Sequence, residues 1–334
     1  MKHPTKSCKE LLVSLALLLA MLAPVHAAQN PASAQAGRST PSNGASIGSH
    51  DSVVNGVKLH YMKAGKGPAI ILLHGYAETS HMWLPLIPLL AKNHTVIAPD
   101  LRGAGDSGKP ETGYEKKAMA NDIHALARSL GISHAQVVGH DIGLMVAYAY
   151  AAQYPTETDR VVLMDAFLPG VGDWTHVWLL HDLWHFHFYG ETPLKLVDGR
   201  ERIYFDHFWN DFAADRNHSI SEADRAFYTK AYSQPGGMRA GFEYFKAFPQ
   251  DAKDFEELSK TKLTMPMLVL SGEKAGGTFL VDQARLVATQ VSGVIIKGSG
   301  HWLLEEAPTQ VIPLLVDFLN QRPLTLGDSA TANR

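Results

Sequence analysis

The sequence contains very little cysteine and no strong excess of charge. Cys8 is the only cysteine among 334 residues, which excludes an intramolecular disulfide bond. The remainder of the chain, free of cysteine, suits an oxidising compartment. Thirty Lys and Arg residues against 33 Asp and Glu residues give a net charge of −3. No basic surface is therefore expected, which argues against nucleic acid or anionic lipid as a partner.

Long hydrophobic runs are also scarce. The one clear run, residues 11–22, is shorter than the roughly 20 residues that a membrane span needs. Three lysines precede this run, and small residues follow at Val25 and Ala27. This pattern predicts a secretory signal peptide over residues 1–27 and a periplasmic or secreted protein that is not bound to membrane after cleavage. Residues 28–50 are small and polar, which predicts a disordered leader.

From Asp51 onward, apolar strand-like segments alternate with helical patterns. This order predicts an α/β protein with a mostly parallel, eight-stranded sheet covered by helices on both faces. The pattern breaks at residues 169–260, which are rich in aromatic residues and contain no convincing buried strand. We therefore expect a core of residues 51–168 and 261–322, a helical cap or lid of residues 169–260 inserted after the sixth strand, and a flexible tail of residues 323–334.

The segment Gly139-His140-Asp141-Ile142-Gly143 lies between a buried strand and an Ala-rich helix. A strand, a tight turn and a helix form the context of a nucleophile elbow, whose usual sequence is G-x-S-x-G. His74-Gly75-Tyr76, Asp165 and His301 each follow another apolar strand. The carboxyl ends of parallel strands lie along one edge of a sheet, where ligands bind. These residues are therefore expected to converge.

An Asp at the elbow predicts a particular chemistry. A carboxylate is already a nucleophile at pH 7, so Asp141 can displace a leaving group from an sp³ carbon without a base. His301 is then available to deprotonate the water that hydrolyses the resulting ester, and Asp165 to orient His301. The backbone N–H groups of Tyr76 and Ile142 are expected to form the oxyanion hole. This mechanism needs no cofactor.

Several histidines and acids leave alternatives open. Glu273 follows a later strand, where many α/β-hydrolases carry the acid of the triad, and it competes with Asp165 for that role. His140 is expected to be structural, and Glu305 and Glu306 are expected to be surface charges on the approach to the last helix. His181, His185 and His187 are closely spaced, but no pattern of carboxylates accompanies them, and we expect no metal site.

Four motifs together resemble one branch of the α/β-hydrolase fold, that of epoxide hydrolases and haloalkane dehalogenases. They are the G-H-D-x-G elbow, the H-G-x turn, the segment DLRGAGDSG at residues 100–108, and the GHW that contains His301. The resemblance covers about residues 51–321. The segments WHFHF (residues 184–188) and FEYFKA (residues 242–247) are also similar to segments of secreted epoxide hydrolases. The resemblance implies an enzyme that adds water to an apolar epoxide to give a vicinal diol, with Asp141, Asp165 and His301 as nucleophile, acid and base. A homodimer is left open.

The resemblance also implies two side chains that donate hydrogen bonds to the epoxide oxygen. His185 matches one of them. The second donor in relatives is a Tyr directly before an Arg or Lys, and Phe245 fills that position here. Its neighbour Tyr244 is the expected replacement, with Tyr204 as the alternative.

A haloalkane or haloacid dehalogenase with the same nucleophile is the rival prediction. Haloalkane dehalogenases commonly hold halide with a Trp after the nucleophile and an Asn after His-Gly, where this chain has Ile142 and Tyr76. Leu144 and Met145 likewise offer no cation for a haloacid carboxylate. A binding protein without activity is disfavoured because both Asp141 and His301 are present.

Overall fold

A computed structural model of the protein describes residues 46–324 and 331–333. The predicted signal peptide and most of the predicted leader lie outside the described residues. The first strand begins at Gly48, so residues 48–50, which we had assigned to the leader, belong to the sheet. This segment lacks the apolar residues by which a strand is recognised in a sequence. It is held instead by backbone pairing, such as Gly48 with Lys63 and His50 with Tyr61.

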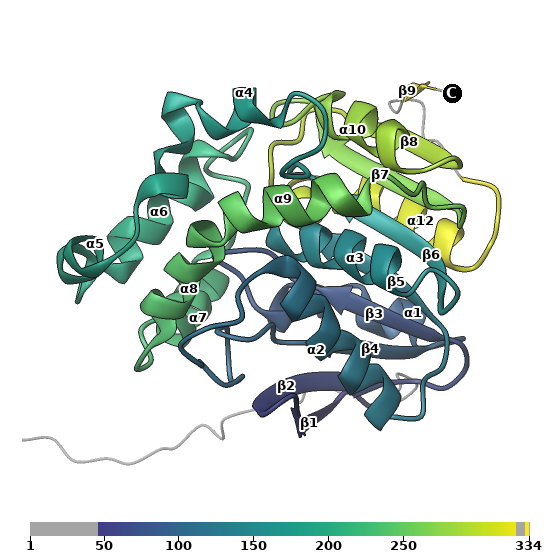
Figure 1. The fold of residues 1–334 in the computed structure, drawn as a ribbon, viewed down its shortest axis with the longest axis horizontal. Coiled ribbons are helices and arrows are strands. Elements are labelled where there is room, and N and C mark those ends of the chain that lie inside the picture. Colours follow the sequence, from purple (N-terminus) through teal and green to yellow (C-terminus); the bar gives the residue numbers. More distant parts are fainter. Residues whose placement is uncertain (1–45, 325–330, 334) are drawn as a thin grey trace, which may run out of the picture. The chain divides into compact units, whose positions relative to one another are not determined.

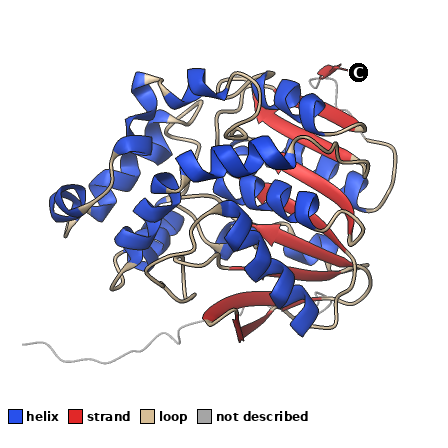
Figure 2. Ribbon diagram, in the orientation of Figure 1, coloured by secondary structure: helices blue, strands red, loops and turns tan. Residues whose placement is uncertain are grey.

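One twisted sheet carries the fold (Figures 1 and 2). Its strands have the spatial order β1-β2-β4-β3-β5-β6-β7-β8-β9. Strands β4, β3, β5, β6, β7 and β8 run parallel, whereas β1, β2 and β9 pair antiparallel with their neighbours. The first eight strands form the predicted mostly parallel sheet. Their bounds, with that of β9, are β1 (Gly48–Val54), β2 (Val57–Ala64), β3 (Ala69–Leu73), β4 (Thr95–Pro99), β5 (Ala135–His140), β6 (Thr158–Met164), β7 (Met267–Gly272), β8 (Val291–Ile296) and β9 (Thr331–Asn333).

The short strand β9 falls in the segment that we had expected to be a flexible tail. It pairs with β8 through contacts such as Ala332 with Val294. Without β9, β8 would be an edge strand with unpaired backbone N–H and C=O groups, to which a neighbouring segment can pair. Such backbone pairing leaves no side-chain pattern in residues 323–334 from which it could be predicted.

Helices cover both faces of the sheet, and the strand sequences explain why. In β3, Ile71 and Leu73 belong to one hydrophobic cluster, whereas Ile70 and Leu72 belong to a second cluster on the other face. Alternate residues of a strand point to opposite faces, so an all-apolar strand needs cover on both. The helices of the core are η1 (Ser80–Trp83), α1 (Ile87–Leu90), α2 (Lys116–Ser129), α3 (Ile142–Gln153), α10 (Phe279–Val287), α11 (Leu303–Glu306) and α12 (Pro308–Leu319).

A run of helices lies between β6 and β7, where the sequence predicted an insertion; we call residues 174–258 the helical insertion (Figure 1). Its elements are α4 (Trp174–Trp178), η2 (His181–His187), α5 (Glu191–Val197), α6 (Glu201–Asp211), α7 (Glu222–Tyr232), α8 (Gly237–Lys246) and α9 (Phe248–Leu258).

A buried ion pair joins the helical insertion to the core. Lys116 of α2 and Asp251 of α9 are both fully buried, with 2.9 Å between Nζ and Oδ2. The same ammonium donates a hydrogen bond to the backbone carbonyl of Tyr244 in α8. Removing one partner would leave a buried charge uncompensated, so this pair fixes α8 and α9 against α2.

No helix among residues 46–324 is long and apolar enough to cross a membrane.

Candidate active site

Asp141 stands on a strained turn between β5 and α3. Its backbone has φ 50° and ψ −122°, a conformation that non-glycine residues seldom adopt. Two glycines allow the turn. A Cβ atom on Gly143 would lie 2.3 Å from the carbonyl oxygen of Leu73, and one on Gly139 would lie 2.2 Å from the carbonyl oxygen of Gly143. The helix can therefore begin directly beside the end of β3, and the Asp141 carboxylate projects at the carboxyl edge of the sheet.

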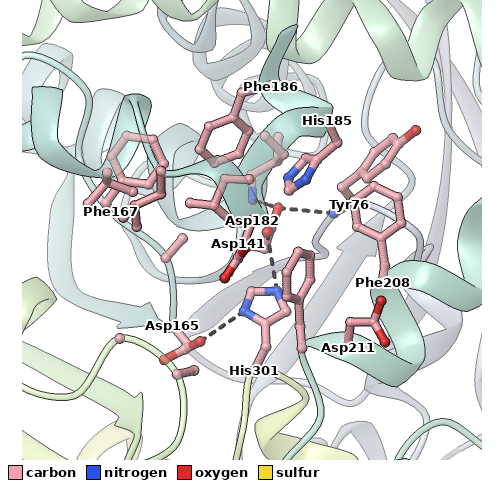
Figure 3. A pocket seen from close by; sticks show the side chains of 18 of the residues that line it. Tyr76, Asp141, Asp165, Phe167, Asp182, His185, Phe186, Phe208, Asp211 and His301 are labelled. Carbon is pink, nitrogen blue, oxygen red and sulfur yellow. Dashed lines mark hydrogen bonds and ion pairs between the residues drawn. The ribbon is translucent and has the colours of Figure 1, made fainter. Parts of the chain in front are cut away.

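The two oxygens of Asp141 have different partners (Figure 3). Oδ1 accepts hydrogen bonds from the backbone N–H groups of Tyr76, at 3.2 Å, and of Ile142. These are the two donors that the sequence predicted for the oxyanion hole. Oδ2 makes neither bond and lies 3.2 Å from Nε2 of His301. One oxygen is thus held by two backbone donors, and the other faces His301.

His301 lies between two carboxylates. Its Nδ1 is 2.8 Å from Oδ2 of Asp165, while Nε2 is directed at Asp141 (Figure 3). The other oxygen of Asp165 accepts bonds from the Ser271 hydroxyl, at 2.9 Å, and the Gly272 N–H, at 2.8 Å. Glu273, the alternative acid, instead accepts a bond from the N–H of Gly298. Asp165 is therefore the acid that contacts His301.

The charges of Asp141 and His301 reinforce each other. Burial alone would lower the pKa of His301, but its hydrogen bonds with Asp141 and Asp165 and their negative charges raise it to about 10. Burial would raise the pKa of Asp141, but the hydrogen bond and charge of His301 lower it to about 2. At pH 7 the resting site therefore holds an ionised Asp141 and a protonated His301.

The loop that carries His301 is held by Glu306, a residue that sequence reasoning took for a surface charge. Its carboxylate accepts the backbone N–H of Gly300, at 3.0 Å, and that of Trp302, at 3.1 Å. These bonds flank His301 on both sides. Nothing in the sequence marks Glu306, because a carboxylate just before a helix is usually a solvent-exposed group.

The same loop is tied to the helical insertion. The N–H of His301 donates to the carbonyl of Phe212 at 2.9 Å, and the N–H of Ala214 donates to Glu306 at 2.8 Å. Behind the elbow, the His140 ring bridges Glu78, at 2.9 Å, and the backbone carbonyl of His301, at 3.0 Å. His140 thus has the supporting place that the sequence suggested, and His301 is fixed from three directions.

A cavity of about 820 Å³ opens above Asp141 and His301. His185, from η2, lines it and is buried, and its Nδ1 has no hydrogen-bond partner among the described residues. Burial lowers the pKa of His185 to about 3 against the opposing charge of Asp141, so the ring is neutral at pH 7. Much of the remaining wall is aromatic, including Phe167, Phe186, Phe208, Phe245, Phe248 and Trp302.

The expectation for Tyr244 needs correction. Its hydroxyl is buried away from the cavity and donates to the backbone carbonyl of Arg102, and the cavity is lined by its neighbour Phe245. Adjacent helical residues point about 100° apart, so only one of the two can face the site. Tyr204 does not replace it, because its hydroxyl lies 3.5 Å from that of Tyr76 and its side chain is not part of the cavity wall.

In the part of the chain that the structure describes, no three His, Cys, Asp or Glu side chains are grouped so that they could hold a metal ion. This includes the closely spaced His181, His185 and His187.

Comparison with known proteins agrees with the fold. A family model described as the alpha/beta hydrolase fold matches residues 68–308. The chain belongs to this family of hydrolases. Its relatives place it more narrowly in the epoxide hydrolase branch.

Three similar proteins illustrate this placement. A soluble epoxide hydrolase from Corynebacterium sp. (strain C12) is 34% identical over 280 residues, which cover 80% of this chain and 96% of the relative. The structure of the epoxide hydrolase CorEH without ligand has a TM-score of 0.77 and 30% identity, covering 83% of this chain and 99% of the other. A fluoroacetate dehalogenase from Burkholderia sp. is 26% identical, covering 80% of this chain and 92% of that relative.

Proposed function

We propose that the protein is an epoxide hydrolase that converts an apolar epoxide to a vicinal diol through an alkyl ester on Asp141. The observation that carries the proposal is that the two carboxylate oxygens of Asp141 have different partners. Oδ1 is held by two backbone N–H groups, and Oδ2 is free of them. A carboxylate arranged in this way can attack carbon with one oxygen and stabilise an oxyanion on the other.

In the first step, Oδ2 of Asp141 attacks a carbon of the epoxide ring. The bond from that carbon to the ring oxygen breaks, and the electron pair stays on the oxygen. His185 lines the cavity as a neutral ring and donates a hydrogen bond to this oxygen. Phe245 and the other aromatic side chains of the wall are not nucleophiles and cannot attack the ring. Asp141 therefore makes the attack.

In the second step, water attacks the carbonyl carbon of the ester. His301 is the base, and the charge of the site explains when it becomes one. While Asp141 is ionised, the pKa of His301 stays near 10 and the ring holds its proton. Ester formation removes the charge of Asp141, so the pKa of His301 falls and the imidazolium releases its Nε2 proton to solvent; the neutral ring can then accept a proton from the attacking water. Asp165 compensates the imidazolium that forms.

The cavity favours an apolar substrate. Its volume of about 820 Å³ lies in the upper part of the usual 300–1,000 Å³ for ligand pockets. The aromatic walls gain most from apolar surface that is removed from water. Lys274 is the one Lys or Arg that lines the cavity within the described residues, and its side chain is 61% exposed. This arrangement gives little support for a small anionic substrate.

A trapping experiment tests the proposal. His301→Gln is incubated with a panel of epoxides and analysed by intact-mass and peptide-mapping spectrometry. The variant should gain the mass of one epoxide on the peptide that contains Asp141, because the ester forms but is not hydrolysed. The double variant with Asp141→Asn should gain nothing, since an amide is a poor nucleophile. Labelling that persists in the double variant would reject Asp141 as the nucleophile.

The rival reaction has its own outcome in the same system. The wild-type protein is incubated with short bromoalkanes and haloacids, and halide release is measured beside diol formation from epoxides. Halide release with no diol from any epoxide would assign the protein to the dehalogenases. Diol formation supports the proposal.

A further inference from the structure

Opening of the epoxide ring depends on groups that donate hydrogen bonds to the departing oxygen, because this oxygen becomes a strongly basic alkoxide. His185 is one such donor. It lines the cavity, and Figure 3 shows its ring beside Asp141. Burial lowers the pKa of His185 to about 3, so the ring is neutral and its N–H group is only a weak acid. The ease of ring opening therefore depends on the other donors in the cavity wall.

The hydroxyl groups of Tyr76, Tyr204 and Tyr244 do not supply a second donor. Tyr244 donates to the carbonyl of Arg102, and neither Tyr244 nor Tyr204 is part of the cavity wall. Tyr76 lines the cavity, but its hydroxyl donates to that of Tyr204 at 3.5 Å. In Figure 3 the Tyr76 hydroxyl points away from Asp141. None of these hydroxyls is therefore directed at the carboxylate that attacks the ring.

The side-chain N–H groups of the wall give the same result. His301 lies between two carboxylates, and Nε1 of Trp302 donates to a backbone carbonyl of α6 at 3.2 Å. Nδ1 of His207 is 2.8 Å from Asp211 and its Nε2 is buried, so neither nitrogen is open to a substrate. The remaining N–H groups belong to exposed side chains, those of His176, His181, Trp184 and Lys274. Among the described residues, His185 is therefore the one buried side chain left to hold the ring oxygen.

Phe245 fills the place beside His185 where a second donor would be useful. Its ring centroid lies 5.1 Å from that of His185 and 4.6 Å from that of Tyr76, whose backbone N–H donates to Asp141. The Phe245 side chain is buried and forms part of the cavity wall. A phenyl ring has no proton to donate. The alkoxide must therefore form with the support of a single neutral side chain.

We propose that the protein selects epoxides with an electronegative atom on the carbon beside the ring, as in glycidyl ethers, and that Phe245 sets this selection. The inference rests on the proposed function and names its substrate class. An electronegative neighbour withdraws electrons from the oxygen of the opened ring and makes the alkoxide a weaker base. Such an alkoxide forms readily with one neutral donor, whereas the alkoxide from a purely hydrocarbon epoxide needs more support.

The bonds and protons balance in this step. Oδ2 of Asp141 forms a bond to the terminal carbon of the ring, the bond from that carbon to the ring oxygen breaks, and the electron pair stays on the oxygen. The N–H group of His185 holds this oxygen, which then takes a proton from solvent. His301 releases a proton to solvent when Asp141 loses its charge, so the site takes up no net proton.

Two epoxides of matched size test the selection. Phenyl glycidyl ether and phenethyl oxirane differ only by an ether oxygen in place of a methylene group. Ester formation at saturating epoxide is followed by rapid-quench intact-mass spectrometry of the full-length His301→Gln chain. The ether should react faster, by up to about tenfold for each unit by which its oxygen lowers the pKa of the product alcohol.

The opposite order would overturn the selection. In a site with a strong acid, electron withdrawal slows ring opening because it makes the ring oxygen harder to protonate. Equal rates, or faster reaction of phenethyl oxirane, would therefore show that the site supplies more acid than His185 alone.

Substitutions in the same His301→Gln background test the part of Phe245. Phe245→Tyr adds a hydroxyl beside His185, and it should speed ester formation from phenethyl oxirane by about 10²-fold, the worth of one donor to developing charge. The ether should gain less, so the ratio of the two rates should fall. Phe245→Leu removes the ring without adding a donor and should keep the ratio.

Phe167→Tyr is the matched control. Phe167 also lines the cavity, and Figure 3 shows it on the other side of Asp141 from Tyr76. Its added hydroxyl should leave the ratio of the two rates unchanged. An unchanged ratio in Phe245→Tyr, or an equal fall in Phe167→Tyr, would overturn the assignment of the selection to Phe245.

Failure of the proposed function gives a different result. If neither these two epoxides nor any other of the panel alkylates the His301→Gln chain, the proposed function fails and the selection fails with it. Alkylation by both epoxides at equal rates rejects the selection alone and leaves the proposed function in place.

Discussion

The replacement of Asp141 by Asn should lower the pKa of His301 and so mimic the electrostatic effect of the ester. Asn keeps a carbonyl oxygen for the N–H groups of Tyr76 and Ile142, but it has no charge, as the ester has none. The imidazolium of His301 would then be balanced by Asp165 alone. The variant therefore isolates the event that we expect to turn His301 into a base.

The size of the effect follows from the contacts of His301. Its pKa of about 10 stands above the ordinary value of 6.5 although burial lowers it, so the two carboxylates at 3.2 Å and 2.8 Å account for the rise. A single opposite charge at such a distance shifts a pKa by about 1–3 units. Loss of Asp141 should therefore bring the pKa of His301 to about 7–9. Each unit corresponds to about 1.4 kcal/mol of interaction between the two side chains.

Proton NMR titration of the histidine rings measures this shift. The His301 signal is identified by its absence from the spectrum of His301→Gln. Asp182→Asn is the control, because the Asp182 side chain lines the cavity but is 96% exposed, and its loss should leave His301 unchanged. The reasoning is refuted if His301 titrates at the same pH in Asp141→Asn as in the wild type, or at a higher one.

Two further predictions concern Tyr244 and Glu306, whose roles were not predicted correctly from the sequence. Tyr244→Phe should leave the rate of ester formation unchanged but reduce the free energy of unfolding by about 1–3 kcal/mol, because the carbonyl of Arg102 loses its buried donor. Rapid-quench kinetics measure the rate and urea denaturation the stability. Slower ester formation in this variant would show that Tyr244 contributes to the active site. Glu306→Gln should slow ester breakdown by about tenfold and leave ester formation alone, because it removes the charge and one of the two accepting oxygens that hold the His301 loop. Equal changes in both rates would show that Glu306 does not act through His301.

The elbow and the base could be predicted because their signals are local. Gly139 and Gly143 flank Asp141. A side chain on Gly143 would clash with the end of β3, and one on Gly139 would clash with the backbone of Gly143. His301 and Asp165 follow apolar strands, and parallel strands end at one edge whatever the rest of the chain does. The positions of these residues therefore depend on short segments of sequence and on a common topology.

The absence of Tyr244 from the cavity wall could not be predicted because it depends on helical phase and on contacts between distant segments. A difference of one residue in α8 decides whether Tyr244 or Phe245 faces the cavity, and both are apolar enough to be buried. Glu306 is recognisable only from its bonds to a loop and to the helical insertion.

The bonds from His301 to Phe212 and from Ala214 to Glu306 have a consequence for substrate entry. A motion that lifted the whole helical insertion would break both bonds and release the base from its position. Such an open form would retain a reactive carboxylate but would lack a placed base, so it could be alkylated without turning over. The side chains of His181 and Asp182 are almost fully exposed, lie on the wall of the cavity and take no part in either bond. The helical insertion therefore holds the loop of the base as well as lining the cavity.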